Sequence, residues 1–470
     1  MSRHKFKGVG VQHASIEILE ARTLLSAAPV GMEPSQVRHA YGFDAVSFTN
    51  SLGSTVKGDG TGQTIAIVTA YDAPNIFSSV NAFDKAFSIN GGTKSLYLQY
   101  GKSPTFLTKV TTSSSTPADP GWLWALETSM DVQWAHSIAP GAKILLVEAA
   151  SDSFVDLFTA VDIARRTPGV SVVSMSWGAP EFRSETFYDS HFTTPAGHAP
   201  VTFVAASGDN GAGANWPSAS PNVISVGGTS LTLNPDNSYK SETAWSGSGG
   251  GVSLYEAKPS YQHSVKQRVL TRITPDVAYV GDPYTGLAVF DTYKNSGWIE
   301  VGGTSAGAPQ WAGLFAIANQ ERAGVGKPTL NGRLQVLPAL YGMATNVFHD
   351  VTVGSNGYSA RAGYDLVTGL GTPIANRIIP ALQSASYTGG VAPAYAKPAE
   401  AMVTLTAAAH SHIAVVSGRS DSIAIPLPQA VNLFAAAEND RLEVTRIADV
   451  TSLLGERSAD LFSSMALTLE

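Results

Sequence analysis

Short apolar runs recur through the first half of the chain, and polar turn residues separate them. Continuous apolar runs of this length, rather than alternating ones, are typical of strands buried on both faces of a parallel sheet. The runs predict strands at residues 64–70, 143–148, 170–176, 201–206 and 222–226.

Between these runs lie stretches whose apolar residues recur every three or four positions, as on one face of a helix. Residues 122–135 and 153–165 have this spacing. Alternating strands and helices predict an α/β fold, with a doubly wound, mostly parallel central sheet flanked by helices. In such folds, functional residues gather in loops beyond the carboxyl ends of the strands.

The pattern divides the chain into three parts. Residues 1–36 are expected to be a leader, residues 37–385 a large catalytic-type domain, and residues 386–470 a linker and a tail of unknown role. The boundary rests on a stretch of small residues and prolines near residues 384–400. No apolar run approaches the roughly 18 residues that a membrane-spanning helix needs.

The composition of the chain argues against several classes of function. Hydrophobic residues make up 44% of the 470 residues, charged residues only 14%, and the net charge is −7. A chain of this kind buries a large core, and with no basic run it is not expected to bind nucleic acid. The absence of cysteine excludes disulfides, thiolate metal sites and a cysteine nucleophile.

The segment GGTSAGAP at residues 302–309 precedes an apolar helical run at 310–318. Small residues permit close approach of a substrate backbone, and the helix N-terminus offers N–H groups to a developing oxyanion. Ser305 is therefore a candidate nucleophile. The ordinary alternative is that Ser305 only caps the helix.

A nucleophilic serine needs a base, and none of the ten histidines lies in an HGT segment of the subtilisin kind. Glu127 and Asp131 stand four residues apart in the predicted helix 122–135, so both lie on one face. The neighbours on this helix are largely apolar, which makes two free charges costly and favours a shared proton. The alternative is a solvated acidic face.

Asp209 lies in the segment SGD, directly after the predicted strand 201–206. This puts its carboxyl group at the carboxyl end of a strand, where active-site residues of α/β proteins gather. An Asp before a Gly-containing turn is equally common in a purely structural role.

Taken in order, ETSMD at 127–131, SGD at 207–209 and GTS at 303–305 resemble the sedolisin (serine-carboxyl peptidase) family. WPSASP at 216–221, SGGG at 248–251 and PDV at 275–277 add to the resemblance, which covers about residues 37–385. It implies a subtilisin-like fold and a secreted endopeptidase that cleaves protein or peptide substrates.

By position, the resemblance makes Ser305 the nucleophile and Glu127 the general base. Asp131 would orient Glu127 and share its proton, and Asp209 would donate to the oxyanion as a neutral acid. Because an ionised Asp209 has no proton to donate, activity should favour acid pH. Glu127 must still accept a proton, so the pH profile should be bell-shaped.

A second region, residues 348–373, contains two acids within Gly-rich turns. Carboxylates and exposed carbonyls suit a hard cation such as Ca²⁺, although Asp-capped turns alone would look the same. The family resemblance implies one structural Ca²⁺. Its ligands would be the side chains of Asp350 and Asp365 and the carbonyl oxygens of Val351, Arg361 and Gly363.

Several features depart from the family. About 36 residues precede the similarity, where family members usually carry a long prodomain, so the route of folding and activation is left open. Thr69 stands near a position where some members extend the catalytic network with a Glu, and Trp177 matches the accompanying Trp. LEARTLLSA at residues 19–27 resembles a segment of exported bacterial proteins and favours secretion.

Two other functions stay open at this point. A catalytically inactive relative serving as a binding or surface module is one, and an ordinary subtilisin is the other. The four matching catalytic positions argue against the first, and the missing HGT segment argues against the second. The chain is expected to act as a monomer, and the sequence does not predict its side-chain specificity.

Overall fold

The computed structural model describes residues 22–26, 28–49, 53–294, 297–387, 404–407, 413–417 and 422–426, with backbone alone for 22–26 and beyond residue 403. The chain divides into two units, Met1–Tyr395 and Ala396–Glu470. Among the described residues no helix is long and apolar enough to cross a membrane.

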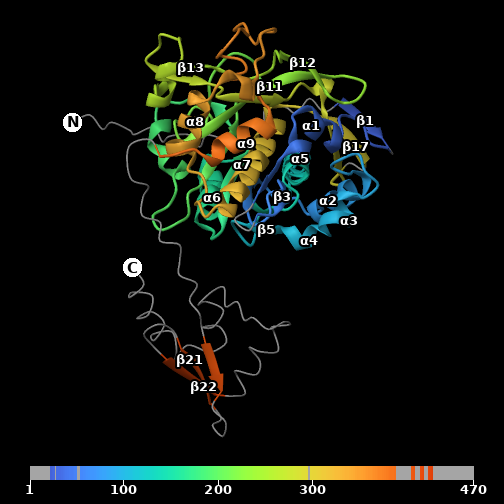
Figure 1. The fold of residues 1–470 in the computed structure, drawn as a ribbon, viewed down its shortest axis with the longest axis vertical. Coiled ribbons are helices and arrows are strands. Elements are labelled where there is room, and N and C mark those ends of the chain that lie inside the picture. Colours follow the sequence, from blue (N-terminus) through green and yellow to red (C-terminus); the bar gives the residue numbers. More distant parts are fainter. Residues whose placement is uncertain are drawn as a thin grey trace, which may run out of the picture. The chain divides into compact units, whose positions relative to one another are not determined.

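The first unit is built on an eight-stranded sheet (Figure 1). All neighbouring strands run parallel except β12, which pairs antiparallel with β11. This confirms the predicted α/β fold with a mostly parallel central sheet. In spatial order the strands are β12 (Tyr239–Ala244), β11 (Val223–Leu233), β9 (Thr202–Ala206), β7 (Val170–Met175), β4 (Thr64–Ala70), β6 (Lys143–Ala149) and β5 (Leu107–Thr111), with β15 (Val277–Val280) beside β11.

All five predicted strands are present, and β11 is longer than expected. The prediction ended at Val226, whereas the strand continues to Leu233. Gly227 and Gly228 give no apolar signal, but their backbones pair with Ala278 and Tyr279 of β15. Pairing with a strand some fifty residues later in the chain therefore extends an element that local sequence ends early.

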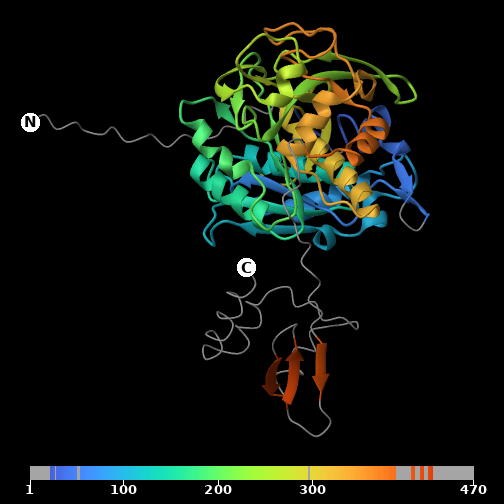
Figure 2. The ribbon, with the colours of Figure 1, turned by 60° about the vertical axis from the view of Figure 1, so that its left-hand side comes forward.

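Helices cover both faces of the sheet, as Figures 1 and 2 show. Along β4, Ile65 and Ile67 belong to the core that α5 and α7 share, whereas Ala66 and Val68 face the core under α6. This alternation is what a strand buried on both faces requires. The helices are α1 (Pro34–Ala40), α2 (Ile76–Ala86), α3 (Leu96–Tyr100), α4 (Ser103–Phe106), α5 (Leu123–Ile138), α6 (Phe154–Arg166), α7 (Gly307–Gly324), α8 (Leu337–Gly342) and α9 (Ala375–Gln383).

The helix α5 is buried on every side from Trp124 to Ile138. Its first turn is capped from outside, because Asp119 Oδ2 accepts the N–H of Ala125 (3.1 Å). The helix packs against α2, α7 and the central sheet. A helix that is buried on every side lies in the core, so any carboxylate on it lies in a low-dielectric environment.

The helix α7 starts just after the GTS segment. Gly303 has φ 117°, which a residue with a Cβ rarely adopts, and a Cβ on Gly302 would lie 2.5 Å from the nitrogen of Pro283. Residues Thr304–Ala306 form a single 3-10 turn that leads into the helix at Gly307. Pro309 falls in the first turn, where its missing N–H costs no hydrogen bond.

Smaller sheets complete the first unit. They are β1 (Arg22–Ser26) with β17 (Gly297–Val301) and β16 (Leu287–Asp291), β2 (Ser47–Thr49) with β3 (Thr55–Lys57), β8 (Ala179–Pro180) with β10 (Asn215–Trp216), β13 (Gly251–Ala257) with β14 (Thr271–Thr274), and β18 (Phe348–His349) with β19 (Thr372–Pro373).

The predicted leader and the predicted tail both contain described strands. In the predicted leader, β1 pairs with β17 and Met32 forms a bridge to Leu287, while residues 1–21 lie outside the described residues. In the predicted tail, β20 (Thr404–Ala407), β21 (Ile413–Ser417) and β22 (Ser422–Pro426) form an antiparallel sheet. The linker after residue 387 lies outside the described residues.

Candidate active site

The four predicted catalytic residues meet where α5, the start of α7 and the loop after β9 converge. Ser305 is 4% exposed in the turn before α7, and Glu127 and Asp131 are fully buried on α5. Asp209 is half-buried in the loop after β9 and lines a small pocket together with Ser305. The carboxyl ends of the strands thus carry the site, as the fold class predicts.

Glu127 and Asp131 form a buried carboxyl pair. Burial raises the pKa of Glu127 well above its ordinary value, and the charges of Asp131 and Asp209 raise it further. Nearby hydroxyls of Ser305 and Ser176 lower it in part, although neither Glu127 oxygen has a hydrogen bond of full geometry. Burial also raises the pKa of Asp131. The pair therefore holds a proton at acid pH, as two carboxyl groups in one dry site must.

Asp209 is tied to the residue before the nucleophile. Its Oδ1 accepts hydrogen bonds from the backbone N–H of Thr304 (2.7 Å) and from the Thr304 hydroxyl (2.8 Å). The same hydroxyl lies 3.0 Å from the N–H of Gly208, which donates to it. The loop after β9 and the turn that carries Ser305 are thus held together by two side chains.

Ser176 belongs to the site, and sequence reasoning did not select it. It follows β7, is 1% exposed, and donates a hydrogen bond to Asp131 Oδ1 (2.7 Å). Its Oγ also lies 3.3 Å from the carbonyl oxygen of Ser305. The available signal was its position, one residue before Trp177 at the carboxyl end of a buried strand.

Thr69 and Trp177 occupy the positions at which some members of the family extend the catalytic network. Thr69 is fully buried and its hydroxyl has no hydrogen-bond partner. Trp177 donates its indole N–H to the carbonyl oxygen of Val68 (3.0 Å), so the ring fixes the strand ends rather than a carboxylate. A threonine hydroxyl cannot replace a second acid in a proton relay near acid pH.

No histidine in the described part of the chain is recorded in contact with Ser305. His136, the one on α5, stacks on Phe106 (ring centroids 3.8 Å apart) and lies 3.6 Å from Asp84. Burial lowers the pKa of His136 to about 3. Of the titratable groups near Ser305, the structure therefore offers carboxyl groups rather than an imidazole of the subtilisin kind.

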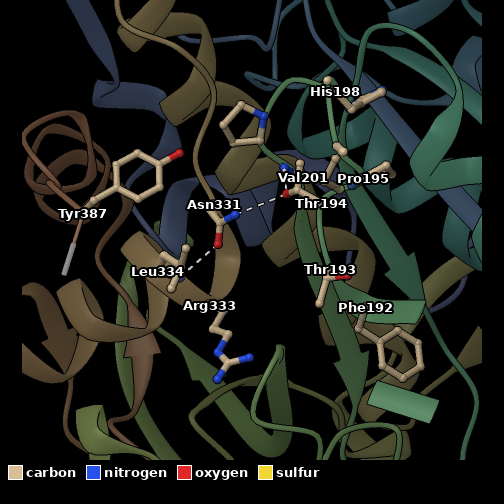
Figure 3. Close-up of a pocket in the computed structure, with 13 residues that line it drawn as sticks. Phe192, Thr193, Thr194, Pro195, His198, Val201, Asn331, Arg333, Leu334 and Tyr387 are labelled. Atoms are coloured by element: carbon tan, nitrogen blue, oxygen red, sulfur yellow. Dashed lines mark hydrogen bonds between the residues drawn. The ribbon is translucent and has the colours of Figure 1, made fainter. Parts of the chain in front are cut away.

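A roomier pocket lies near the amino end of β9, whereas Asp209 follows the carboxyl end of that strand (Figure 3). It is lined by residues 192–198, Pro200, Val201, Asn331, Arg333, Leu334 and Tyr387. Asn331 donates a hydrogen bond to the Thr194 hydroxyl (3.2 Å) and accepts the N–H of Leu334 (2.9 Å). These amide contacts hold the pocket wall.

The predicted calcium ligands all belong to one loop between β18 and β19. Asp350 Oδ2 accepts the N–H of Gly363 (2.9 Å), and Asp365 Oδ2 accepts the N–H of Arg361 (3.1 Å). Asp365 is fully buried, and burial raises its pKa. Two carboxylates that flank one short backbone segment give an oxygen-rich donor set suited to a hard cation. Val351 is buried beside Asp350.

Asp276, from the PDV segment, has a structural role. Its carboxylate forms a fully buried ion pair with Arg272 (2.7 Å) and accepts the hydroxyl of Tyr341 (2.7 Å). It also accepts the N–H of Ser225, which joins β15 to β11 behind the site.

Comparisons with known proteins agree with this geometry. The subtilase family profile matches residues 123–336. Kumamolisin from Bacillus sp. (strain MN-32) is 32% identical over 412 residues, which cover 77% of this chain and 65% of that protein. Sedolisin from Pseudomonas sp. (strain 101) is 32% identical over 217 residues, or 39% of this chain and 35% of that protein.

A solved structure of Pseudomonas sedolisin, a serine-carboxyl proteinase complexed with two molecules of pseudo-iodotyrostatin, superposes with a TM-score of 0.62. It is 25% identical and covers 76% of this chain and 99% of that chain. The chain spans less than two thirds of the length of the two relatives named above.

Proposed function

The chain belongs to the sedolisin family, and from that premise we propose that it is a serine-carboxyl peptidase that hydrolyses peptide bonds at acid pH. One observation carries the proposal. A buried carboxyl pair on α5 meets Ser305 at the start of α7, and Asp209 is hydrogen-bonded to the residue before Ser305. This arrangement supplies a nucleophile, a proton acceptor and an acid next to the oxyanion position.

In the proposed reaction, Ser305 Oγ attacks the carbonyl carbon of the scissile bond and its proton passes to Glu127. Glu127 can accept it because Asp131 takes up the proton that the pair shares. The relay then protonates the leaving amine, the C–N bond breaks, and an acyl-enzyme forms on Ser305. A water molecule, deprotonated by the same pair, hydrolyses the acyl-enzyme and restores the serine hydroxyl.

The oxyanion of the tetrahedral intermediate would be stabilised by a protonated Asp209. The Thr304 N–H and hydroxyl fix one carboxyl oxygen of Asp209, so the direction of the other oxygen is set before substrate binds. Preorganised donors of this kind contribute most where water is excluded. The acid pH optimum follows, because this donor exists only while Asp209 carries its proton.

The test is hydrolysis of an internally quenched peptide from pH 3 to pH 8. Wild type should cleave at acid pH with a bell-shaped profile, and Ser305→Ala and Glu127→Gln should each lose activity by several orders of magnitude. Glu256→Gln is the matched control, because it removes another buried carboxylate that lies outside the catalytic cluster. Thermal melts of all four proteins show whether each is folded.

Two outcomes would contradict the proposal. Full turnover in folded Ser305→Ala would exclude this nucleophile. Absence of cleavage by folded wild type at every pH, with no labelling by a peptide aldehyde, would favour an inactive relative that acts as a binding module.

We also propose one structural Ca²⁺, held by the side chains of Asp350 and Asp365 and by the carbonyls of Val351, Arg361 and Gly363. The support is the oxygen donor set and the burial of Asp365, whose negative charge a cation would offset. When bound, the ion would cross-link the loop, and no catalytic step passes through it.

The proposed function also includes export of the protein and a class of substrate. The segment at residues 19–27 and the family resemblance support action outside the cell on protein or peptide substrates. Fractionation of a tagged full-length chain, with and without residues 1–27, tests export directly.

A further inference from the structure

Ser176 stands at the junction of three elements of the site. It follows the last residue of β7, it contacts Asp131 on α5, and it contacts the backbone of Ser305 before α7. Its position is fixed, since it is 1% exposed and the next residue, Trp177, is anchored to Val68 through its indole N–H. The reaction proposed above assigns no step to a hydroxyl at this position.

The Ser176 hydroxyl has one hydrogen and two acceptors within reach. Asp131 Oδ1 is 2.7 Å away and the Ser305 carbonyl oxygen is 3.3 Å away. An ionised Asp131 is the stronger acceptor, so the hydrogen points to it. Once Asp131 is protonated, that attraction falls, and the same hydrogen can turn to the Ser305 carbonyl.

We propose that Ser176 is a positioning residue whose single hydroxyl hydrogen alternates between Asp131 and the Ser305 carbonyl, and so couples proton transfer in the carboxyl pair to the position of the nucleophile. The inference deepens the proposed function, because it rests on Ser305 as nucleophile and on the carboxyl pair as proton relay. It assigns no atom transfer to Ser176 itself.

The coupling acts during the attack of Ser305 on the scissile carbonyl group. Before attack, Ser176 stabilises the ionised form of Asp131, which keeps the shared proton on Glu127. During attack, the proton from Ser305 moves into the pair and Asp131 becomes neutral. The Ser176 hydrogen then stabilises the turn that carries the acylated serine. One buried hydroxyl thus keeps a partner in both states, which avoids the cost of an unsatisfied group.

Other acids near α5 do not share this role. Asp209, in the loop after β9, acts on Glu127 through its charge. Three further acids on elements packed against α5 contact residues other than Asp131. Asp84 of α2 faces His136, Glu148 of β6 accepts the N–H of Ala73 and faces Lys109, and Asp291 of β16 accepts the Ser129 hydroxyl.

The experiment compares wild type with Ser176→Ala, Ser176→Thr and Ser174→Ala. Ser174 is the matched control, because it is fully buried on the same strand and its hydroxyl has no hydrogen-bond partner. The profile of kcat/KM against pH is recorded with the quenched peptide. In Ser176→Ala the acidic limb of this profile should shift to higher pH by about one unit. The reason is that the ionised carboxyl pair on α5 has lost a charge-assisted hydrogen bond.

At the optimum, kcat of Ser176→Ala should fall by about tenfold while KM stays unchanged, because the lost contact differs between the ground state and the transition state. Ser176→Thr retains a hydroxyl and should restore the acidic limb. An unmoved limb in folded Ser176→Ala, or an equal shift in Ser174→Ala, would overturn the inference.

A second readout does not need peptidase activity. In a Ser305→Ala background, the carbonyl band of the protonated carboxyl pair is titrated by difference infrared spectroscopy, and Glu127→Gln assigns the band. Removing the Ser176 hydroxyl should raise the midpoint of that titration. If wild type is inactive but removal of the Ser176 hydroxyl still raises the midpoint, the proposed function is refuted and the role of Ser176 is not. If removal of the hydroxyl leaves the midpoint unchanged, the role of Ser176 is refuted.

Discussion

Asp209 uses one of its carboxyl oxygens to hold the turn that carries Ser305. The Thr304 N–H and hydroxyl both donate to Oδ1, at 2.7 and 2.8 Å. An asparagine can keep these two contacts through its side-chain oxygen and present its amide nitrogen where the second carboxyl oxygen lies. We therefore expect the site to accept a donor that does not depend on pH.

This predicts opposite outcomes for two substitutions at Asp209. Asp209→Asn should keep measurable cleavage and extend the alkaline limb of kcat/KM toward neutral pH, because the amide donates at every pH. Asp209→Ala should lower kcat by about 10²–10³-fold. The measurement is the pH profile with the quenched peptide, and Asn210→Ala, at the exposed neighbouring position, is the control. Equal loss in both variants at all pH values would contradict the prediction, because the amide donor would then not replace the acid.

Single residues also show how far the sequence leads. Ser305, Glu127, Asp131 and Asp209 can be proposed because each chemical role demands a residue type at a recognisable position. Ser176 cannot, because a serine after a buried strand is ordinary, and only its contacts with α5 and the Ser305 turn distinguish it. Those contacts join segments 45 and 129 residues apart in sequence.

At the scale of elements, Glu181 holds the segment after Trp177 against β13, and Glu185 holds a turn within that segment. Glu181 Oε2 accepts the N–H of Leu254 (2.9 Å), and Glu185 Oε2 accepts the N–H of Phe182 (2.7 Å). Burial, with the charge of Glu181, raises the pKa of Glu185 to about 9. Burial, with the charge of Asp189, raises the pKa of Glu256 to about 8. Such acids favour the folded state while they are protonated.

The sign of the effect follows from proton linkage. Glu185 binds its proton more tightly in the folded state than in the unfolded chain, where the ordinary value is 4.5. Its contribution to stability is therefore complete below about pH 4.5 and is lost as pH rises toward 9. Protonated acids of this kind are compatible with the proposed activity at acid pH, and their ionisation lowers the free energy of unfolding near neutral pH.

Glu185→Gln should remove this pH dependence. The amide resembles the protonated acid, so the variant should match wild type at pH 4 and exceed its free energy of unfolding at pH 7 by about 1–3 kcal/mol. Chemical denaturation at both pH values, in a Ser305→Ala background, measures the difference. Glu33→Gln, an exchange of an exposed acid, should change neither value by as much. A variant less stable than wild type at pH 7 would contradict the prediction.

Helices and strands whose formation depends on the local sequence pattern were largely predictable. Parallel strands and the helices α5 and α6 follow from apolar runs and spacing, and they match the structure to within a few residues. The sheet of β1, β16 and β17 and the pairing of β15 with β11 were not predicted. Their residues alternate weakly, and what holds them is pairing with distant segments, as when Trp134 of α5 donates its indole N–H to the Ala288 carbonyl (3.0 Å).

At the scale of the molecule, the loop with Asp350 and Asp365 is part of the frame that holds the site. It lies between β18 and β19, and Gly371 at its end accepts the N–H of Ala278 in β15 (3.0 Å). Leu370 donates its N–H to the carbonyl of Asp276 (2.9 Å). Since β15 pairs with β11, these contacts connect the loop to the central sheet.

A cation in that loop should therefore stabilise the whole first unit rather than the loop alone. In a Ser305→Ala background, Ca²⁺ at 100 times its dissociation constant should add about 2.7 kcal/mol to the free energy of unfolding and raise Tm by several degrees relative to chelator. Asp365→Asn should abolish the response because it removes a buried charged ligand, whereas Asp236→Asn, at an exposed turn, should retain it. An equal Tm in chelator and in excess Ca²⁺ for the parent protein would exclude the site, and an unchanged response in Asp365→Asn would move it elsewhere.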